Sequence, residues 1–237
     1  MGNGTTGALR GMLLDIDGTL IDSNDHHAQA WQETFEHFGI RSEFAEIRRL
    51  IGMGGDKLLP EISGIEKDSP KGKEISEFRG EHFRKNHLPG IRSFPRTREL
   101  VQRLSDDGIT IVVATSAAKD ELKGLLRIAG VEDLIEAKAT ASDARHSKPD
   151  PDIVEAALER AGLIPGETMM LGDTPYDIEA AGKAGVPVIA LRCGGWSDAE
   201  LAGAVAIYDD PADLLAHYDE SPVGRRLKRT VTGRQSA

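Results

Sequence analysis

The sequence Leu13-Leu14-Asp15-Ile16-Asp17-Gly18-Thr19-Leu20 places two carboxylates, Asp15 and Asp17, at the end of an apolar run. We expect residues 11–14 to end a buried strand and Gly18-Thr19 to form the turn that leaves it. Side chains alternate along a strand, so both acids start on one side at its carboxyl end, where open α/β sheets bind ligands. Two acids this close repel each other unless a cation neutralises them or one keeps a proton. The stretch therefore predicts a divalent metal site, or a nucleophile beside a proton donor.

Length and charge limit the classes of protein to consider. The 237 residues suffice for one large domain, or for a core domain with a smaller insertion. The net charge of −10 argues against a nucleic-acid partner, which would need a basic face. No stretch approaches the ~20 apolar residues of a membrane span, so no membrane partner is expected. With Cys193 as the only cysteine and no signal-peptide pattern at residues 1–7, the cytoplasm is the predicted location. Residues 1–7 and 219–237, including the basic run 224–229, are expected to be tails.

Strand and helix patterns alternate in the second part of the chain, after Pro89-Gly90. This alternation predicts a parallel sheet with helices on both faces. The strand at 186–191 contains Pro187, so it is expected near an edge of the sheet. The predicted strands are 110–114, 134–137, 168–171 and 186–191, the predicted helices are 96–107, 119–129, 151–161 and 175–184, and weaker elements follow at 198–201, 204–207 and 213–217.

The segment between the acidic pair and Pro89 shows a different sequence pattern. Its apolar residues recur at helical spacing, and it contains no strand pattern. Aromatic residues such as Trp31 and Phe35 are expected to form a small core there. The predicted helices are 25–39, 44–50, 55–62 and 72–85. The fold class is therefore α/β, a Rossmann-like doubly wound core with a helical cap inserted after the first strand. The expected division is residues 8–22 and 90–218 for the core and 23–89 for the cap.

Three further polar sites follow later strands, each with an ordinary structural alternative. Thr115-Ser116-Ala117 could hold a phosphoryl oxygen with a hydroxyl and backbone N–H groups, but Ser116 could instead cap the next helix. Lys148 precedes a proline-stiffened turn, although most lysines are simply exposed. Asp173 follows Gly172 at a strand end, and Asp177 falls in the first turn of the next helix. Each signal alone is weak, but four in this order along one sheet are specific.

In these residues the chain resembles the haloacid dehalogenase-like superfamily. The four parts of that signature match Asp15-Ile16-Asp17-Gly18-Thr19, Ser116, Lys148 and Gly172-Asp173-Thr174-Pro175-Tyr176-Asp177. The resemblance covers residues 10–218. The helical insertion is similar to the cap of the subfamily that contains phosphoglycolate phosphatases and β-phosphoglucomutases.

The resemblance implies a role for each matching residue. Asp15 would be the nucleophile that takes the phosphoryl group, and Asp17 the acid and base that protonates the leaving oxygen and then activates water. Asp15, Asp173 and the main-chain carbonyl of Asp17 would bind Mg²⁺, while Asp177 would hold a water or Lys148, with direct ligation left open. The groups expected to bind phosphate are Ser116, Lys148, Ala117, Gly18 and Thr19, and His27 is the cap residue expected to approach the substrate.

The resemblance also favours one branch of the superfamily. The dehalogenases lack the acid at the position of Asp17, so phosphotransfer is expected rather than halide displacement. The mutases carry an arginine just after the glycine that matches Gly52, whereas this chain has Gly52-Met53-Gly54-Gly55-Asp56-Lys57. Lys57 is a poor substitute for a bidentate arginine. A Mg²⁺-dependent phosphatase for a small phosphorylated metabolite is therefore expected, with a β-phosphoglucomutase-like enzyme as the alternative.

A second alternative comes from a different class of protein. A receiver-like phosphoacceptor or a metal-binding module would also use an acidic pocket, a hydroxyl and a lysine, but would not turn over. Two features oppose a receiver: the acceptor Asp15 belongs to the first strand, and helices are inserted beside it. The absence of a nucleotide-binding fingerprint opposes a binding module. The substrate and the oligomeric state stay open, and a monomer is compatible with the sequence.

Overall fold

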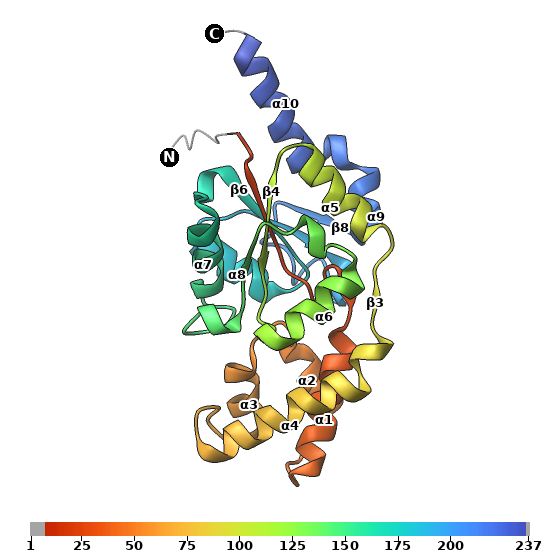
Figure 1. Ribbon diagram of the computed structural model, residues 1–237, viewed down its shortest axis with the longest axis vertical. Coiled ribbons are helices and arrows are strands. Elements are labelled where there is room, and N and C mark those ends of the chain that lie inside the picture. The colour runs from red at the N-terminus through yellow and green to blue at the C-terminus, as the bar shows by residue number, and fades with distance from the viewer. Residues whose placement is uncertain (1–7, 236–237) are drawn as a thin grey trace.

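A computed structural model describes residues 8–235 of the chain (Figure 1). The predicted tail at residues 1–7 lies outside the described residues. A parallel six-stranded sheet with helices on both faces forms one body, and four helices gather beyond one end of it (Figure 1). The predicted α/β class, with a Rossmann-like core and a helical cap, is confirmed. Among residues 8–235, no helix combines the length and the apolar composition needed to cross a bilayer.

The sheet has the strand order β5-β4-β1-β6-β7-β8, with every neighbouring pair parallel. Leu14 of β1 pairs with Val113 of β4 on one side and with Leu171 of β6 on the other. The residues that follow these three strands therefore emerge together at one edge of the sheet. The strands are β1 Gly11–Leu14, β4 Thr110–Ala114, β5 Ala137–Ala139, β6 Thr168–Gly172, β7 Val188–Leu191 and β8 Ala206–Tyr208.

Alternate side chains of β1 enter two separate cores. Met12 and Leu14 pack on the face covered by α5, α6 and α9, and Leu13 packs on the face covered by α7 and α8. The alternation follows from the two-residue period of a strand. The helices of this body are α5 Thr97–Asp106, α6 Lys119–Ala129, α7 Asp152–Ala161, α8 Pro175–Lys183, α9 Pro211–Ala216 and α10 Pro222–Gln235. Single 3-10 turns lie at η1 Leu88–Gly90, η2 Glu132–Leu134, η3 Ala141–Asp143, η4 Pro165–Glu167, η5 Arg192–Gly194 and η6 Tyr218–Glu220.

Four helices between β1 and η1 form the cap, and they have an apolar core of their own. Trp31 and Phe35 stack with ring centroids 5.3 Å apart in this core. The chain enters and leaves the cap through a short antiparallel ribbon of β2, Ile21–Asp22, and β3, Arg92–Ser93. The cap helices are α1 Asn24–His37, α2 Phe44–Leu50, α3 Gly55–Ser63 and α4 Pro70–Asn86. The division at residues 22/23 and 89/90 stays a prediction, which the position of this ribbon supports.

The predicted helices begin and end within two residues of their expected limits, but the strand predicted at 134–137 was wrong. Residues 132–134 form η2, and β5 begins only at Ala137, because Leu134 and Ile135 pack into the core instead of pairing. β7 lies near an edge of the sheet as predicted, because only β8 lies beyond it. Pro187 precedes β7 and its carbonyl accepts a hydrogen bond from Met170 N at 2.9 Å, so the missing N–H of proline costs no ladder bond there. Residues 198–201, where a weak element was expected, lie in turns.

The predicted C-terminal tail is also wrong in part, because residues 222–235 form α10. Val223 is fully buried in the core that contains Leu214 and Tyr218, and Leu227 packs against the same core. Two apolar residues four positions apart on one helix face were therefore enough to dock an otherwise basic segment.

We predict that Val223→Ala lowers the free energy of unfolding by about 2 kcal/mol, because it deletes two buried methyl groups and leaves a small cavity. Val205→Ala is the matched control, since Val205 is 53% exposed and should change stability by less than about 0.5 kcal/mol. Urea denaturation of both variants measures the difference. Equal stabilities of the two variants would mean that α10 does not dock on the core.

Candidate active site

The acidic and basic residues singled out in the sequence meet at the carboxyl edge of the sheet. Asp15 follows β1, Asp173 follows β6, and Lys148 lies in the loop between η3 and α7. Asp15 is 6% exposed, Lys148 1% and Asp173 0%. The parallel register of β1 with β6 brings the two aspartates together, and the loop beyond β5 brings the lysine.

Lys148 lies between two carboxylates. Its Nζ is 2.5 Å from Asp15 Oδ1 and 2.7 Å from Asp177 Oδ1. Asp177 is held in turn by the first turn of α8, because its Oδ2 accepts hydrogen bonds from the backbone N and the hydroxyl of Thr174. The pKa of Lys148 is raised, because the charges of Asp15 and Asp177 outweigh the opposing effect of burial. Lys148 is therefore a fixed, fully charged ammonium.

One ammonium does not balance the carboxylates of this cluster. Burial raises the pKa of Asp15 well above its ordinary value although Lys148 opposes the rise, and Asp177, Asp173 and Asp17 raise it further. Burial and the charge of Asp177 raise the pKa of Asp173 to about 7. Both pKa values are raised because the carboxylates are buried and outnumber the single lysine. A bound cation would lower both pKa values again.

Asp173 is fixed by two donors from the residues that follow β1. Thr19 Oγ1 donates to Asp173 Oδ1 at 2.9 Å, and Asn24 Nδ2 donates to Asp173 Oδ2 at 2.9 Å. Gly18 lies beneath this contact with φ +76°, and a Cβ there would come within 2.2 Å of Asp173 Oδ2. Glycine at position 18 is thus required both by the turn and by the close approach of Asp173.

Asp17 faces the cap. Its Oδ1 accepts hydrogen bonds from Ser23 Oγ at 2.6 Å and from His27 Nε2 at 2.8 Å. Burial would raise the pKa of Asp17, but His27 and Ser23 outweigh it and hold the pKa below its ordinary value. The predicted approach of His27 to the active centre is thus an approach to Asp17, with the His27 ring stacked on Phe83 at 4.2 Å.

A cavity of 410 Å³ lies between the core and the cap, and the acidic pair opens into it. Its wall on the core side includes Asp15, Asp17 and Ser116, and its wall on the cap side includes Arg79 and the loop at residues 51–55. A cavity lined by two carboxylates, one of them paired with a buried lysine, can bind a small anionic substrate and carry out nucleophilic chemistry on it.

A comparison with protein families identifies the family in which this arrangement of residues occurs. Residues 12–191 match the sequence profile of the haloacid dehalogenase-like hydrolases. The chain belongs to this family.

Curated relatives and solved structures agree with the family assignment. The chain is 26% identical to the pyrophosphatase PpaX of Oceanobacillus iheyensis, over 80% of this chain and 85% of the relative. It is 27% identical to the phosphoglycolate phosphatase of Rhodospirillum rubrum, over 86% of this chain and 89% of the relative. A candidate β-phosphoglucomutase from Bacteroides vulgatus has a TM-score of 0.83 and 25% identity, over 93% of this chain and 91% of that one.

In this haloacid dehalogenase-like hydrolase the donor set fits a hard divalent cation. Carboxylate oxygens of Asp15, Asp173 and Asp177 lie within 4.8 Å of one another, and all three residues are buried. Mg²⁺ prefers such oxygen ligands. Asp177 Oδ1 lies 2.7 Å from Lys148 Nζ and its Oδ2 accepts from Thr174, which agrees with the expected role of Asp177 in holding Lys148 and leaves direct ligation open. The assignment of Asp15, Asp173 and the carbonyl of Asp17 as ligands stays a prediction.

The loop after β4 differs from its prediction in detail. Ser116 is not the N-cap of α6, because Ala118 occupies that position. The Ser116 hydroxyl instead contacts the carbonyl of Gly52 in the cap at 3.4 Å. Thr115, which we did not single out, also lines the cavity, and its Oγ1 accepts a hydrogen bond from Ala117 N at 3.1 Å. The residue pattern alone offered two adjacent hydroxyls here, and the family resemblance selected Ser116.

Arg79 is the residue of this site that sequence analysis missed. It reaches the cavity from α4, with its Nη1 3.2 Å from Glu121 Oε1 and its Nη2 beside His27 Nδ1. Glu121 is 3% exposed, so the pair is nearly dry. Lys57, in contrast, is paired with Asp150 across the edge of the cap. A single arginine on a charged helix carries no signal in the sequence, because its role depends on how α4 packs against α1.

We predict that Lys148→Met lowers the free energy of unfolding by about 3–5 kcal/mol in EDTA, because it leaves Asp15 and Asp177 buried without their cation. Lys183→Met is the control, since Lys183 is 42% exposed and its contacts with Glu179 and Pro149 should contribute less than about 1 kcal/mol. Chemical denaturation of the two variants tests this, and similar losses in both would contradict it.

Proposed function

We propose that this chain is a Mg²⁺-dependent phosphatase that hydrolyses a small phosphorylated metabolite through an aspartyl-phosphate intermediate. The observation that carries the proposal is the dry contact of Lys148 Nζ with Asp15 Oδ1 at 2.5 Å, beside a cavity that Asp17 also lines. The relatives named as a pyrophosphatase and a phosphoglycolate phosphatase support a small phosphorylated substrate.

In the first step, a carboxylate oxygen of Asp15 attacks the phosphorus atom. Asp15 Oδ1 is held by Lys148, while Oδ2 has only a long contact of 3.4 Å with the Thr19 hydroxyl among the described residues. Oδ2 is therefore the oxygen available for attack. The new Asp15–phosphorus bond forms as the bond to the leaving oxygen breaks. Asp17, whose pKa is held low in the free site, takes up a proton when the anionic substrate binds beside it and raises that pKa, and it donates this proton to the leaving oxygen.

In the second step, water hydrolyses the aspartyl phosphate. Asp17, now a carboxylate, accepts the proton of the water that attacks phosphorus, and the Asp15–phosphorus bond breaks to release inorganic phosphate. Both described hydrogen bonds to Asp17 engage Oδ1, so Oδ2 is free for these transfers. Asp17 returns to its protonated form, and Asp15 to its carboxylate, ready for another substrate.

The negative charge of the phosphoryl group is the remaining demand on the site. Lys148 and the Ser116 hydroxyl are the proposed phosphoryl-binding groups, with the Thr115 hydroxyl as an addition. The proposal does not rest on the N–H groups expected from the sequence, because each already donates to another acceptor: Ala117 N to Thr115 Oγ1, Gly18 N to Ile21 O and Thr19 N to Ile16 O. Mg²⁺, held by Asp15, Asp173 and the Asp17 carbonyl, would neutralise charge on both the nucleophile and the phosphoryl oxygens. Positioning and charge neutralisation are what phosphoryl transfer mainly requires.

A sugar phosphomutase is the second candidate, and Arg79 favours it. A mutase must bind a second phosphate from the cap side, and Arg79 brings a guanidinium to that wall of the cavity. However, Glu121 neutralises much of its charge at 3.2 Å. A second phosphate would have to displace a buried carboxylate, so the phosphatase remains the better proposal.

We predict that Asp15→Asn lowers the rate of p-nitrophenyl phosphate hydrolysis roughly 10⁴-fold or more, because an amide cannot serve as the nucleophile. Asp106→Asn is the control, since Asp106 is an exposed aspartate on α5 and its loss should leave the rate unchanged. Circular dichroism verifies that both variants fold. Substantial turnover by Asp15→Asn, after deamidation is excluded by mass spectrometry, would rule out the covalent mechanism.

We expect phosphate release from phosphoglycolate or pyrophosphate in Mg²⁺, its loss in excess EDTA, and its recovery when Mg²⁺ is added back. The comparison substrate is β-glucose 1-phosphate with a sugar bisphosphate primer, followed by formation of glucose 6-phosphate. Faster isomerisation than hydrolysis would replace the phosphatase with a mutase. Stoichiometric labelling of the chain without turnover would indicate a phosphoacceptor, and full activity in EDTA would remove the metal from the proposal.

A further inference from the structure

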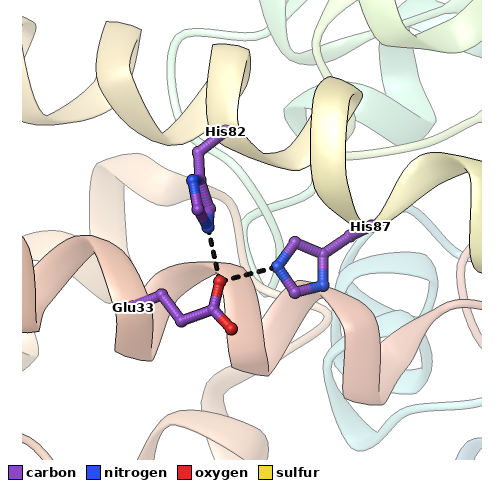
Figure 2. Close-up of side chains that lie close together, drawn as sticks. All are labelled: Glu33, His82 and His87. Carbon is purple, nitrogen blue, oxygen red and sulfur yellow. Dashed lines mark hydrogen bonds and ion pairs between the residues drawn. The ribbon is translucent and has the colours of Figure 1, made fainter.

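A second cluster of metal-binding side chains lies in the cap, outside the cavity. Glu33 comes from α1, His82 from α4, and His87 is the residue at which α4 ends. Figure 2 shows both imidazole rings pointing a nitrogen at one oxygen of Glu33. The distance from His87 Nε2 to Glu33 Oε2 is 3.0 Å, and His82 Nε2 contacts the same oxygen. The three ligand atoms lie within 4.8 Å of one another.

The backbone holds His87 in place for this arrangement. His87 is the C-cap of α4, where its N–H donates to the carbonyl of Phe83 at 3.0 Å and its carbonyl accepts from Gly90 N at 2.9 Å. Its side chain is 8% exposed and lies nearly parallel to the Phe83 ring. The change of backbone direction at this residue brings His87 next to His82, five positions earlier. The two imidazoles are thus oriented by the fold before any ligand binds.

The chemistry of the three groups selects the class of ion. Two imidazole nitrogens and one carboxylate oxygen form a donor set that suits Zn²⁺ and similar transition metals, whereas Mg²⁺ and Ca²⁺ prefer oxygen ligands alone. Glu33 is 48% exposed, so water has access to a fourth position. Glu33 Oε2 is in contact with Nε2 of both His82 and His87, so one carboxylate oxygen already faces both imidazoles as ligation of a shared ion requires.

Asn86 supplies the partner that an ion-binding His82 would need. Asn86 Nδ2 lies 3.0 Å from His82 Nδ1, so Nδ1 accepts this hydrogen bond while Nε2–H donates to Glu33. When a metal replaces the proton on Nε2, Nδ1 must carry a proton and donate it. A rotation of the Asn86 amide that exchanges its nitrogen and oxygen satisfies that donor without any movement of the backbone.

We propose that Glu33, His82 and His87 form a binding site for one divalent transition-metal ion of the Zn²⁺ type, separate from the acidic cluster at Asp15 and Asp173. The ion replaces the two Nε2 protons and joins α1 to the end of α4. His87 directly precedes η1, through which the chain returns to the core. The ion would therefore fix the exit of the cap relative to its first helix.

The test is a Co²⁺ titration of the full chain in excess Mg²⁺, which keeps the acidic cluster occupied. Four-coordinate Co²⁺ with nitrogen ligands absorbs visible light far more strongly than six-coordinate Co²⁺ with oxygen ligands, so the spectrum identifies the site. We expect one equivalent of strongly absorbing Co²⁺ that stoichiometric Zn²⁺ displaces. Glu33→Gln and His82→Gln should each weaken this binding by about 100-fold or more, beyond what the loss of an outer partner produces.

Two matched controls lie on α1, the helix of Glu33. Glu36→Gln alters an exposed glutamate three residues after Glu33. His37→Gln alters an exposed histidine that stacks on Phe78, as His82 also does. Both should bind Co²⁺ like the unaltered chain. Because Glu33 is half exposed, Glu33→Gln is expected to fold, and circular dichroism verifies it.

The proposal is overturned if the unaltered chain gives no strongly absorbing Co²⁺ complex. It is equally overturned if Glu33→Gln and His82→Gln bind Co²⁺ as tightly as the two controls, since the ion would then lie elsewhere. The measurement uses no substrate, so its outcome is independent of whether the chain is a phosphatase.

Discussion

The buried contact of Lys148 with Asp15 and Asp177 is the interaction on which the rest of the active site depends. A single ammonium lies 2.5 and 2.7 Å from two carboxylates, and Asp173 adds a third acid close by. Three acids against one base leave the cluster short of positive charge, and burial, together with the neighbouring carboxylates, raises the pKa values of Asp15 and Asp173. A bound divalent cation would make up this shortage before an anionic phosphoryl group enters the proposed site.

The sheet makes this arrangement possible through its register. Leu14 of β1 lies opposite Val113 of β4 and Leu171 of β6, so the polar residues that follow them emerge at one level. A shift of one residue in either pairing would turn the acids or the hydroxyls toward the opposite face. The alternate side chains of β1 that enter two different cores hold this register, because a slipped strand would expose one core and overfill the other.

The sequence contained the part of the site that is local to strand ends. Asp15 and Asp173 could be predicted because each directly follows an apolar strand, and Lys148 because its place in the order matches a specific signature. Their roles as metal and phosphate ligands remain predictions. Arg79 and Asn24 could not be found in this way, since each acts on a group contributed by a distant segment. The same limit explains the errors in the fold: whether Leu134 pairs or packs, and whether Val223 docks, is decided by partners far along the chain.

The cap contributes to the chemistry as well as to enclosure. Asp17 belongs to the core, but Ser23 and His27, at the start of the cap, both donate to its Oδ1. His27 is oriented by Arg79, and Arg79 by Glu121 of the core helix α6. The orientation of the acid that must protonate the leaving oxygen therefore depends on a chain of contacts that crosses from core to cap and back. If the cap moved away from α6, the contact of Arg79 with Glu121 would be lost, whereas Arg79 and His27, which both belong to the cap, would stay together. Closure of the cap thus adds a buried carboxylate to the group that orients His27, and His27 in turn donates to Asp17.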